Sequence, residues 1–431
     1  MRKIILSMIF AFSVLLCKSQ SQIDQINLLM LTSKYQDALS LCDEVIKQSP
    51  QNAHFYYVKA IICKQLFKYP DASLAIKQAI SIEPENIDYL AEYASVLVKR
   101  NLKNDAIKVY KSVQEKNKYN VSSGLYLSNY YLKEREFEQA KDILLSLYEK
   151  DTTNSYFARN IGLCYIKLGK KDEALHWLSR TIKLDSTDVK AYELFSLVYS
   201  ALEEFDLSLE YIEKAIKLDS LNKNLYIEAG NIHVLRNHNY LAIPKFLKAF
   251  EIDPNDESIA RSLGFCYYKI KKNDKAKYYL NIAKIIGSMD LQIYLCLGGI
   301  YKQENSLDSS LFYYDEALKI IKPDYESFFA IYKNKAENYY YLNEFDKAIE
   351  NYNMALDTDI EMFWGTYKKN EVKVDIAAIY AEKLNDKQKA IEYLEKVNKS
   401  TISLNKNYFD YAQQQINRLK EELFFERKQN M

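Results

Sequence analysis

Glycine and proline are scarce in this chain, which has only nine glycines and six prolines among 431 residues. So few turn-forming residues argue against an all-β fold, which needs many tight turns. Apolar residues at 48% and charged residues at 27% are typical of a folded protein. We therefore expect helices joined by short loops.

An excess of charge of one sign is also missing, because 59 basic residues face 58 acidic ones. A nucleic-acid-binding protein concentrates positive charge to neutralise phosphates. The composition therefore predicts that nucleic acid is not a partner.

Motifs that carry chemistry are absent as well. The four histidines have no partner at metal-ligand spacing, and the glycines form no phosphate-binding loop. Beyond residue 20 the cysteines number five, at irregular spacings, which favours packing as small apolar side chains over a disulfide framework or a metal site. They are Cys42, Cys63, Cys164, Cys266 and Cys296. We predict no enzyme activity, no catalytic residues, no metal and no cofactor.

The N-terminus has the pattern of a signal peptide, predicted over residues 1–21. Arg2 and Lys3 precede an apolar run from Ile4 to Leu16, which is shorter than the roughly 20 residues of a membrane span. Small residues at Ser19 and Ser21 fit cleavage before Gln22. We expect an exported protein, located in the periplasm or cell envelope, or secreted.

Cys17 leaves a second interpretation open. The apolar residues before it resemble a lipidation motif, although the adjacent Leu16 is larger than the small residue normally found there. Lipidation would anchor the protein to a membrane. Membrane association is expected only in that case.

A repeat of 34 residues is the strongest feature of the sequence. One small residue recurs at this interval without slippage, at Ala38, Ala72, Ala106, Ala140, Ala174, Ser208, Ala242, Ala276 and Ser310. Twelve positions earlier stand further small residues, where two helices of a repeat would cross: Ala60, Ala94, Ser128, Gly162, Ser196, Gly230, Gly264 and Gly298. Prolines follow the second helix at Pro50, Pro84 and Pro254. A helix pair of this kind leaves an apolar face that only the next pair can cover.

The period and these positions resemble the tetratricopeptide repeat (TPR) family, and in particular exported bacterial TPR-repeat proteins. The resemblance covers nearly the whole chain after residue 21. It implies an all-α fold, a right-handed α/α superhelix or TPR solenoid with a C-terminal capping helix. Most of the 38 tyrosines would then belong to the architecture.

The register changes after residue 322. Ala348 follows Ser310 by 38 residues and Ala390 follows Ala348 by 42. The first four extra residues are expected to lengthen a helix beyond Pro323, and the next eight to form an irregular loop or shifted helix start around Met362–Gly365. We divide the chain into nine contiguous repeats over 22–322, two further repeats with insertions over 323–400, and a capping helix over 401–431.

The TPR resemblance also implies a binding groove lined by first helices, at 18, 15, 14 and 11 positions before the signature small residue. These offsets select Asn129, Arg159, Asn160, Leu163, Leu197, Ile227, Asn231, Arg261 and Phe265. Such a surface suits an extended peptide or a partner helix; the alternative is that these residues pack internally or face water. The Lys and Arg clamp with which some TPR domains hold a peptide's C-terminal carboxylate is not met, because Leu163 and Phe265 follow the two arginines.

We therefore predict a non-catalytic scaffold of the bacterial cell envelope that binds protein or peptide partners. The alternative is an exported sensor or carrier subunit that binds a glycan, peptide or small ligand.

Overall fold

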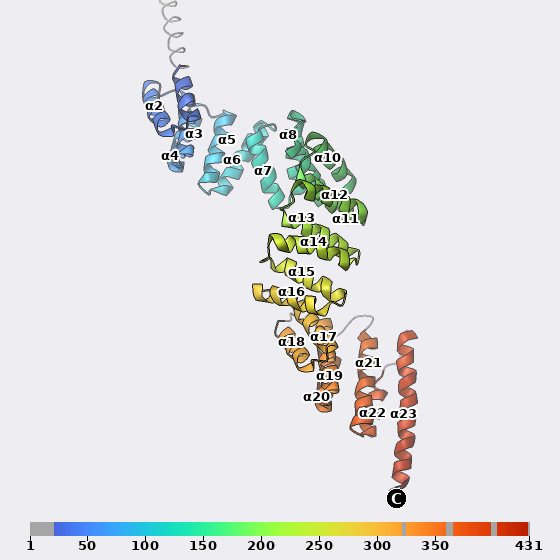
Figure 1. The fold of residues 1–431 in the computed structure, drawn as a ribbon. Coiled ribbons are helices and arrows are strands. Elements are labelled where there is room, and N and C mark those ends of the chain that lie inside the picture. Colours follow the sequence, from blue (N-terminus) through green and yellow to red (C-terminus); the bar gives the residue numbers. More distant parts are fainter. Residues whose placement is uncertain (1–20, 321–324, 359–364, 398–402, 430–431) are drawn as a thin grey trace, which may run out of the picture. The chain divides into compact units, whose positions relative to one another are not determined.

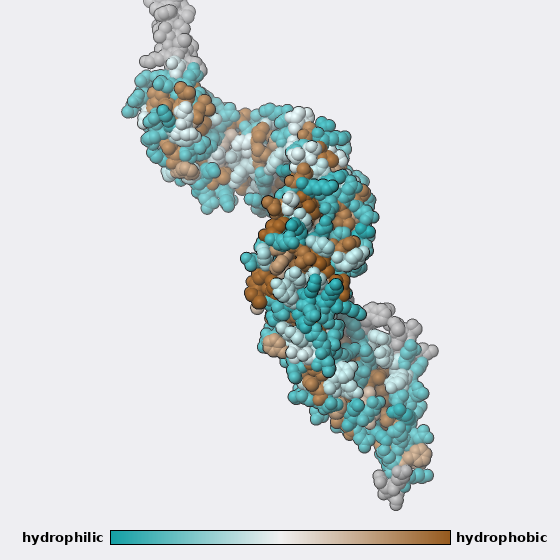
Figure 2. Space-filling model, in the orientation of Figure 1, coloured by the Kyte–Doolittle hydropathy of each residue, from teal (hydrophilic) through white to brown (hydrophobic). Residues whose placement is uncertain are grey.

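The computed structural model describes residues 21–320, 325–358, 365–397 and 403–429, and every regular element in these ranges is a helix. The chain divides into two compact units, Met1–Leu218 and Asp219–Met431, called unit 1 and unit 2 below. Figure 1 shows the helices following one another in pairs along each unit, and the face drawn in Figure 2 carries hydrophilic residues with smaller hydrophobic patches between them. Most of the predicted signal peptide, Cys17 and residues 362–364 lie outside the described ranges. No described helix is both long and apolar enough to span a membrane.

Unit 1 consists of alternating first and second helices. The first helices are residues 21–31, α3 (Ala53–Gln65), α5 (Ile87–Lys99), α7 (Val121–Lys133), α9 (Ser155–Lys167) and α11 (Val189–Ala201). The second helices are α2 (Tyr35–Gln48), α4 (Tyr69–Ile82), α6 (Lys103–Lys116), α8 (Phe137–Lys150), α10 (Lys171–Leu184) and α12 (Phe205–Leu218).

Unit 2 continues the alternation. Its first helices are α13 (Lys223–Leu235), α15 (Glu257–Lys269), α17 (Leu291–Gln303), α19 (Tyr325–Tyr341) and α21 (Gly365–Ala378), which is followed by the π-helical turn η1 (Ile379–Lys383). The second helices are α14 (Asn239–Ile252), α16 (Asn273–Ile286), α18 (Leu307–Ile320), α20 (Phe345–Asp357) and α22 (Lys387–Glu395). A final helix, α23 (Ser403–Gln429), packs on α21 and α22.

Local sequence fixes where the first helices begin. The residue before each of eight first helices is Asn or Asp, and its side chain accepts a hydrogen bond from a backbone N–H of the first turn. Such N-caps satisfy donors that the helix itself leaves open. They recur every 34 residues: Asn52, Asn86, Asn120, Asn154, Asp188, Asn222, Asp256 and Asp290.

The turn inside each repeat uses a left-handed backbone residue. Positive φ values between 52° and 74° occur five residues before every signature small residue, and Asn or Gly occupies six of these eleven positions. Asn and Gly adopt this conformation with the least strain. Glu203 and Phe67 adopt it too, so the repeat geometry overrides local preference there.

The predicted helix crossings are confirmed. All eleven signature small residues are fully buried at the fourth position of their second helices. Opposite them, a Cβ added to Gly230 would lie 2.7 Å from the Phe246 ring, and one added to Gly298 would lie 2.8 Å from the Tyr314 ring. A missing side chain on the first helix therefore makes room for a large one on the second.

Tyrosines stack between the two helices of several repeats. Tyr267 and Tyr279 have ring centroids 5.6 Å apart with planes at 7°, and Tyr301 and Tyr313 repeat this arrangement at 5.3 Å and 7°. Offset stacking of this kind adds about 0.5–1.5 kcal/mol to the burial of each pair. These tyrosines belong to the architecture, as the sequence predicted.

Both register changes lengthen first helices. α19 has 17 residues where the regular first helices have 13, which accounts for the first four extra residues. α21 begins at Gly365 and runs into η1, so the helix start is shifted toward the N-terminus and a π-helical turn absorbs part of the remaining insertion. Residues 362–364 themselves lie outside the described ranges.

Ion pairs connect successive repeats at their first helices. The Arg159 guanidinium lies 2.7 Å from the Asp188 carboxylate, while the other oxygen of Asp188 caps α11 through the N–H of Ala191 at 2.9 Å. The same arrangement recurs in unit 2, where Arg261 lies 2.7 Å from the capping residue Asp290. One carboxylate thus begins a helix and ties it to the repeat before.

We predict that Gly264→Ala destabilises unit 2. Its Cβ would lie 2.5 Å from Leu280 Cδ2 and 3.1 Å from the Leu280 backbone nitrogen, so the second helix must move. Overpacking costs about 1–3 kcal/mol, which outweighs the gain of about 1 kcal/mol from replacing a helical glycine. Denaturant unfolding of unit 2 would measure the net loss.

Gly162→Ala provides the matched control, because its nearest contact, with Leu178 in unit 1, is 3.2 Å and involves only a side chain. Its effect should be close to neutral. Equal destabilisation by the two substitutions would contradict the crossing geometry.

We also predict that Asp188→Ala destabilises the fold by about 2–3 kcal/mol, because it removes a helix cap and leaves the Arg159 charge without its partner. Asp188→Asn keeps an oxygen for the cap and should cost less. Thermal or denaturant unfolding of the two variants measures the difference. A loss for Asn as large as that for Ala would show that the cap contributes nothing.

Candidate functional site

First-helix residues line the largest cavity described here in unit 1. The cavity has a volume of about 950 Å³ and is enclosed by α5, α6 and α7. From α7 it takes Ser122, Leu125, Tyr126 and Asn129, which occupy the four predicted groove offsets of that repeat. We call this cavity the unit 1 pocket.

Unit 2 has two neighbouring cavities along its first helices. One of about 320 Å³ is lined by α13, α14, α15 and α17, and one of about 690 Å³ by α15, α17, α18 and α19. Tyr268 lines both. We call the two cavities together the unit 2 groove.

Three of the nine predicted site residues line these surfaces. Asn129 lies in the unit 1 pocket, where its Oδ1 is 3.5 Å from the Tyr156 hydroxyl. Asn231 and Phe265 lie together in the smaller cavity of the unit 2 groove. The structure therefore brings one predicted pair together within unit 2.

Other predicted residues have structural partners. Arg159 and Arg261 pair with the helix caps described above. Asn160 is buried and its amide donates to the carbonyl of Tyr156 in its own helix at 2.7 Å. These three side chains are thus held within the fold, which is the internal-packing alternative.

The last three predicted residues line neither surface. Leu163 packs against the apolar core around α10 and α11, and Ile227 is half-buried on α13. Leu197 is 43% exposed on α11. The sequence offsets select these three residues as well as Asn129 and Phe265. They cannot tell which of them line a cavity, because side chains of the neighbouring repeat cover some of these positions and leave others open.

Besides the predicted Asn231, five carboxamide residues that the prediction did not name line the unit 2 groove. The two cavities share an abundance of carboxamides beside their apolar walls: Asn231, Asn239, Gln292, Gln303, Asn305 and Asn334. Gln292 and Asn334 stand at the same offsets, 18 and 14, that selected the predicted residues. Applying the offsets to the ninth and tenth repeats would have found them.

Charged side chains on α17, α19 and α21 form a network beside this groove. Lys302 donates to Asn334 at 3.0 Å and pairs with Glu337, and Lys333 pairs with Glu371 at 2.8 Å. Burial, with the nearby charge of Glu371 as a lesser cause, raises the pKa of Asp375 to about 6. The lysines here are thus engaged with carboxylates.

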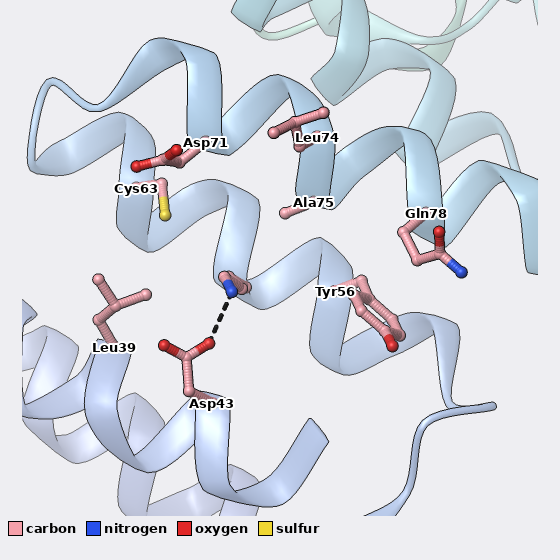
Figure 3. Close-up of a pocket in the computed structure, with 9 residues that line it drawn as sticks. Leu39, Asp43, Tyr56, Cys63, Asp71, Leu74, Ala75 and Gln78 are labelled. Atoms are coloured by element: carbon pink, nitrogen blue, oxygen red, sulfur yellow. Dashed lines mark ion pairs between the residues drawn. The ribbon is translucent and has the colours of Figure 1, made fainter. Parts of the chain in front are cut away.

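A further hollow of about 420 Å³ lies among α2, α3 and α4 (Figure 3). It is lined largely by second-helix residues and lies off the predicted groove offsets. Figure 3 shows Asp43 in an ion pair, whose partner is Lys59 at 2.6 Å. Although burial acts to lower it, the hydrogen bond and charge of Asp43 raise the pKa of Lys59, so the amine stays protonated.

The buried thiols are not activated for chemistry. Cys266 and Cys296 line the unit 2 groove, and burial raises their pKa values to about 11 and about 12. Thiolates are the reactive form, so both remain weak nucleophiles near neutral pH. The five cysteines in the described ranges are buried, as expected of packing residues. In the described ranges, no group of three or more His, Cys, Asp or Glu side chains is arranged to hold a metal.

Comparison with known proteins adds to these observations. The family model described as Tetratricopeptide repeat matches residues 160–188, 189–220 and 371–401. Curated proteins gave no match to the sequence.

Several solved structures are similar to this chain. The chain is similar to the C-terminal part of a TPR repeat-containing protein from Cytophaga hutchinsonii, with 17% identity, 56% of this chain and 98% of that one covered, and a TM-score of 0.50. It is also similar to a tetratricopeptide repeat protein from Parabacteroides merdae, with 16% identity, coverages of 57% and 97%, and a TM-score of 0.44. Similarity to YrrB, described as a TPR protein with an unusual peptide-binding site, has 21% identity, coverages of 43% and 94%, and a TM-score of 0.39.

The 34-residue period, the small residues at the helix crossings and the family match at three places agree with one another. The chain contains tetratricopeptide repeats, which the family model matches over residues 160–188, 189–220 and 371–401, and it has the all-α fold of TPR solenoids.

Proposed function

We propose that this protein is a non-catalytic scaffold that binds an extended peptide segment of a partner protein in the unit 2 groove. The observation that carries this proposal is that two neighbouring cavities share Tyr268 in their lining and follow the successive first helices α13, α15, α17 and α19. TPR folds are typically used for protein–protein interaction, which agrees with a surface of this kind.

The lining suits a peptide in two ways. Phe265, Tyr268 and Val234 offer apolar contacts for side chains of a partner. The carboxamides along the groove can each donate to and accept from a peptide main chain, which repeats the same pair of groups at every residue. Apolar anchors with a few placed polar groups are the usual composition of a binding site.

The thiols of this groove and the lysines of the adjoining network favour a binding role over a catalytic one. The thiols of Cys266 and Cys296 are held protonated by burial, and the lysines of the adjoining network are engaged with carboxylates. A binding role uses the shape and polarity of the surface without needing an activated nucleophile.

Selection of twelve-residue peptides from a random displayed library on the full-length chain tests the proposal. We expect the selected peptides to lose about tenfold or more in affinity for Phe265→Ala, because buried aromatic anchors dominate interface energies. Asn231→Ala, which removes an exposed side chain from the same cavity, should weaken binding without disturbing the fold. Fluorescence anisotropy measures both affinities.

Phe312→Ala is the matched control, since Phe312 is 55% exposed on α18 and lines neither cavity. Selected peptides that bind all three variants as well as the original chain would contradict the proposal. Selection of no peptide, together with saturable binding of a glycan that Phe265→Ala abolishes, would support the carrier alternative instead.

We also propose that the chain works outside the cytoplasm after removal of its signal peptide. Arg2, Lys3 and the apolar run to Leu16 support this. Cleavage before Gln22 would retain every described residue that is buried in unit 1, because the first of these is Ile26.

Intact-mass measurement of the protein from its producing cells checks this. A mature N-terminus at Gln22 is expected, and a lipid-modified N-terminus at Cys17 would replace the free form with an anchored one. A chain that still begins at Met1 would contradict export by this signal.

A further inference from the structure

The unit 1 pocket is formed by a second helix as well as a first helix, and two lysines line it. α6 contributes Lys103, Asn104, Ile107 and Tyr110, so a second helix forms one wall and the first helix α7 the other. Its volume of about 950 Å³ lies at the upper end of the range usual for ligand sites.

Tyrosines give the pocket a fixed aromatic wall. Tyr110 is almost fully buried, and its ring lies 4.6 Å from that of Tyr126. Tyr130 follows one turn later on α7 and also lines the pocket. An aromatic surface held this firmly offers contact area at little entropic cost to binding.

Three polar side chains that line the pocket have no bonding partner within the described part of the chain. Within the described part of the chain, the side chains of Lys103, Asn104 and Lys133 make no hydrogen bond or ion pair. Glu134 is the one carboxylate in the lining, so ammonium groups exceed carboxylates there. By contrast, Lys64 on α3 pairs with Glu92 at 2.6 Å, and Lys333 in unit 2 pairs with Glu371.

We infer that the unit 1 pocket binds an acidic peptide segment. The ammonium groups of Lys103 and Lys133 pair with the carboxylates of the peptide. The apolar or aromatic side chains of the peptide pack on the tyrosine wall, and Asn104 and Asn129 form hydrogen bonds with its main chain. The lining contains no arginine, the residue best suited to bidentate phosphate recognition, which favours carboxylates over phosphates. This site is independent of the proposed function, because all of its residues belong to unit 1 and the peptide groove belongs to unit 2.

A fluorescein-labelled octapeptide of alternating Glu and Tyr residues tests the inference by fluorescence anisotropy with the full-length chain. We expect saturable binding that weakens with added salt, and much weaker binding of the same peptide with Gln in place of Glu. Lys103→Gln and Lys133→Gln should each lower affinity about threefold to fivefold, as expected for exposed ion pairs.

Lys108→Gln is the matched control. Lys108 is exposed on α6 and lies outside the pocket lining, and its substitution removes the same charge as the two pocket variants. The affinity of this variant for the peptide should stay within about twofold of that of the original chain. Phe265→Ala should leave this binding unchanged, which separates the result from any failure of the unit 2 groove.

Three outcomes would overturn the inference. The first is equal affinity for the Glu and Gln peptides, and the second is an equal loss with Lys108→Gln, which would indicate unspecific charge attraction. The third is the absence of saturable binding of the acidic peptide.

Discussion

The close crossing of the two helices in each repeat is the contact on which the rest of this structure depends. A first helix carries Gly, Ala or Ser where the second helix crosses it, and the second helix fills that space with Leu, Ile, Phe or Tyr. Burying such a side chain stabilises the fold by about 1.5–3 kcal/mol. A pair joined in this way still exposes an apolar face, so each repeat is stable only against its neighbours.

Polar contacts then set how one repeat follows the next. The capping Asn or Asp residues begin the first helices, and Asp188 and Asp290 also pair with an arginine of the preceding repeat. Each of these two aspartates both caps a helix and binds an arginine. Arg159 and Arg261, which stand at predicted groove positions, therefore belong to the architecture. What remains for binding is the surface that packing leaves open, which is why the unit 2 groove consists mainly of aromatic and carboxamide side chains.

The lysines show how the same residue type takes different roles along the chain. Lys302 and Lys333 are held by carboxylates on the following first helices, whereas Lys103 and Lys133 have no such partner among the residues that the structure describes. These four lysines stand at different positions of the repeat, so the helix that each side chain meets decides whether it finds a carboxylate. A solenoid can therefore carry binding surfaces of different charge on one scaffold.

Sequence alone determined the repeat, the all-helical fold, the crossing positions and the lengthened helix after residue 322, because each follows from local spacing that recurs many times. It also gave the helix face that lines the cavities, since Asn129, Asn231 and Phe265 lie where the offsets placed them. Only the tertiary structure decided that Arg159 and Arg261 pair with helix caps, that Asn160 is buried and that Leu163 packs into a core. The physical reason is that an offset fixes which way a side chain leaves its own helix, whereas its partners come from the next repeat, whose residues at that point differ from one repeat to another.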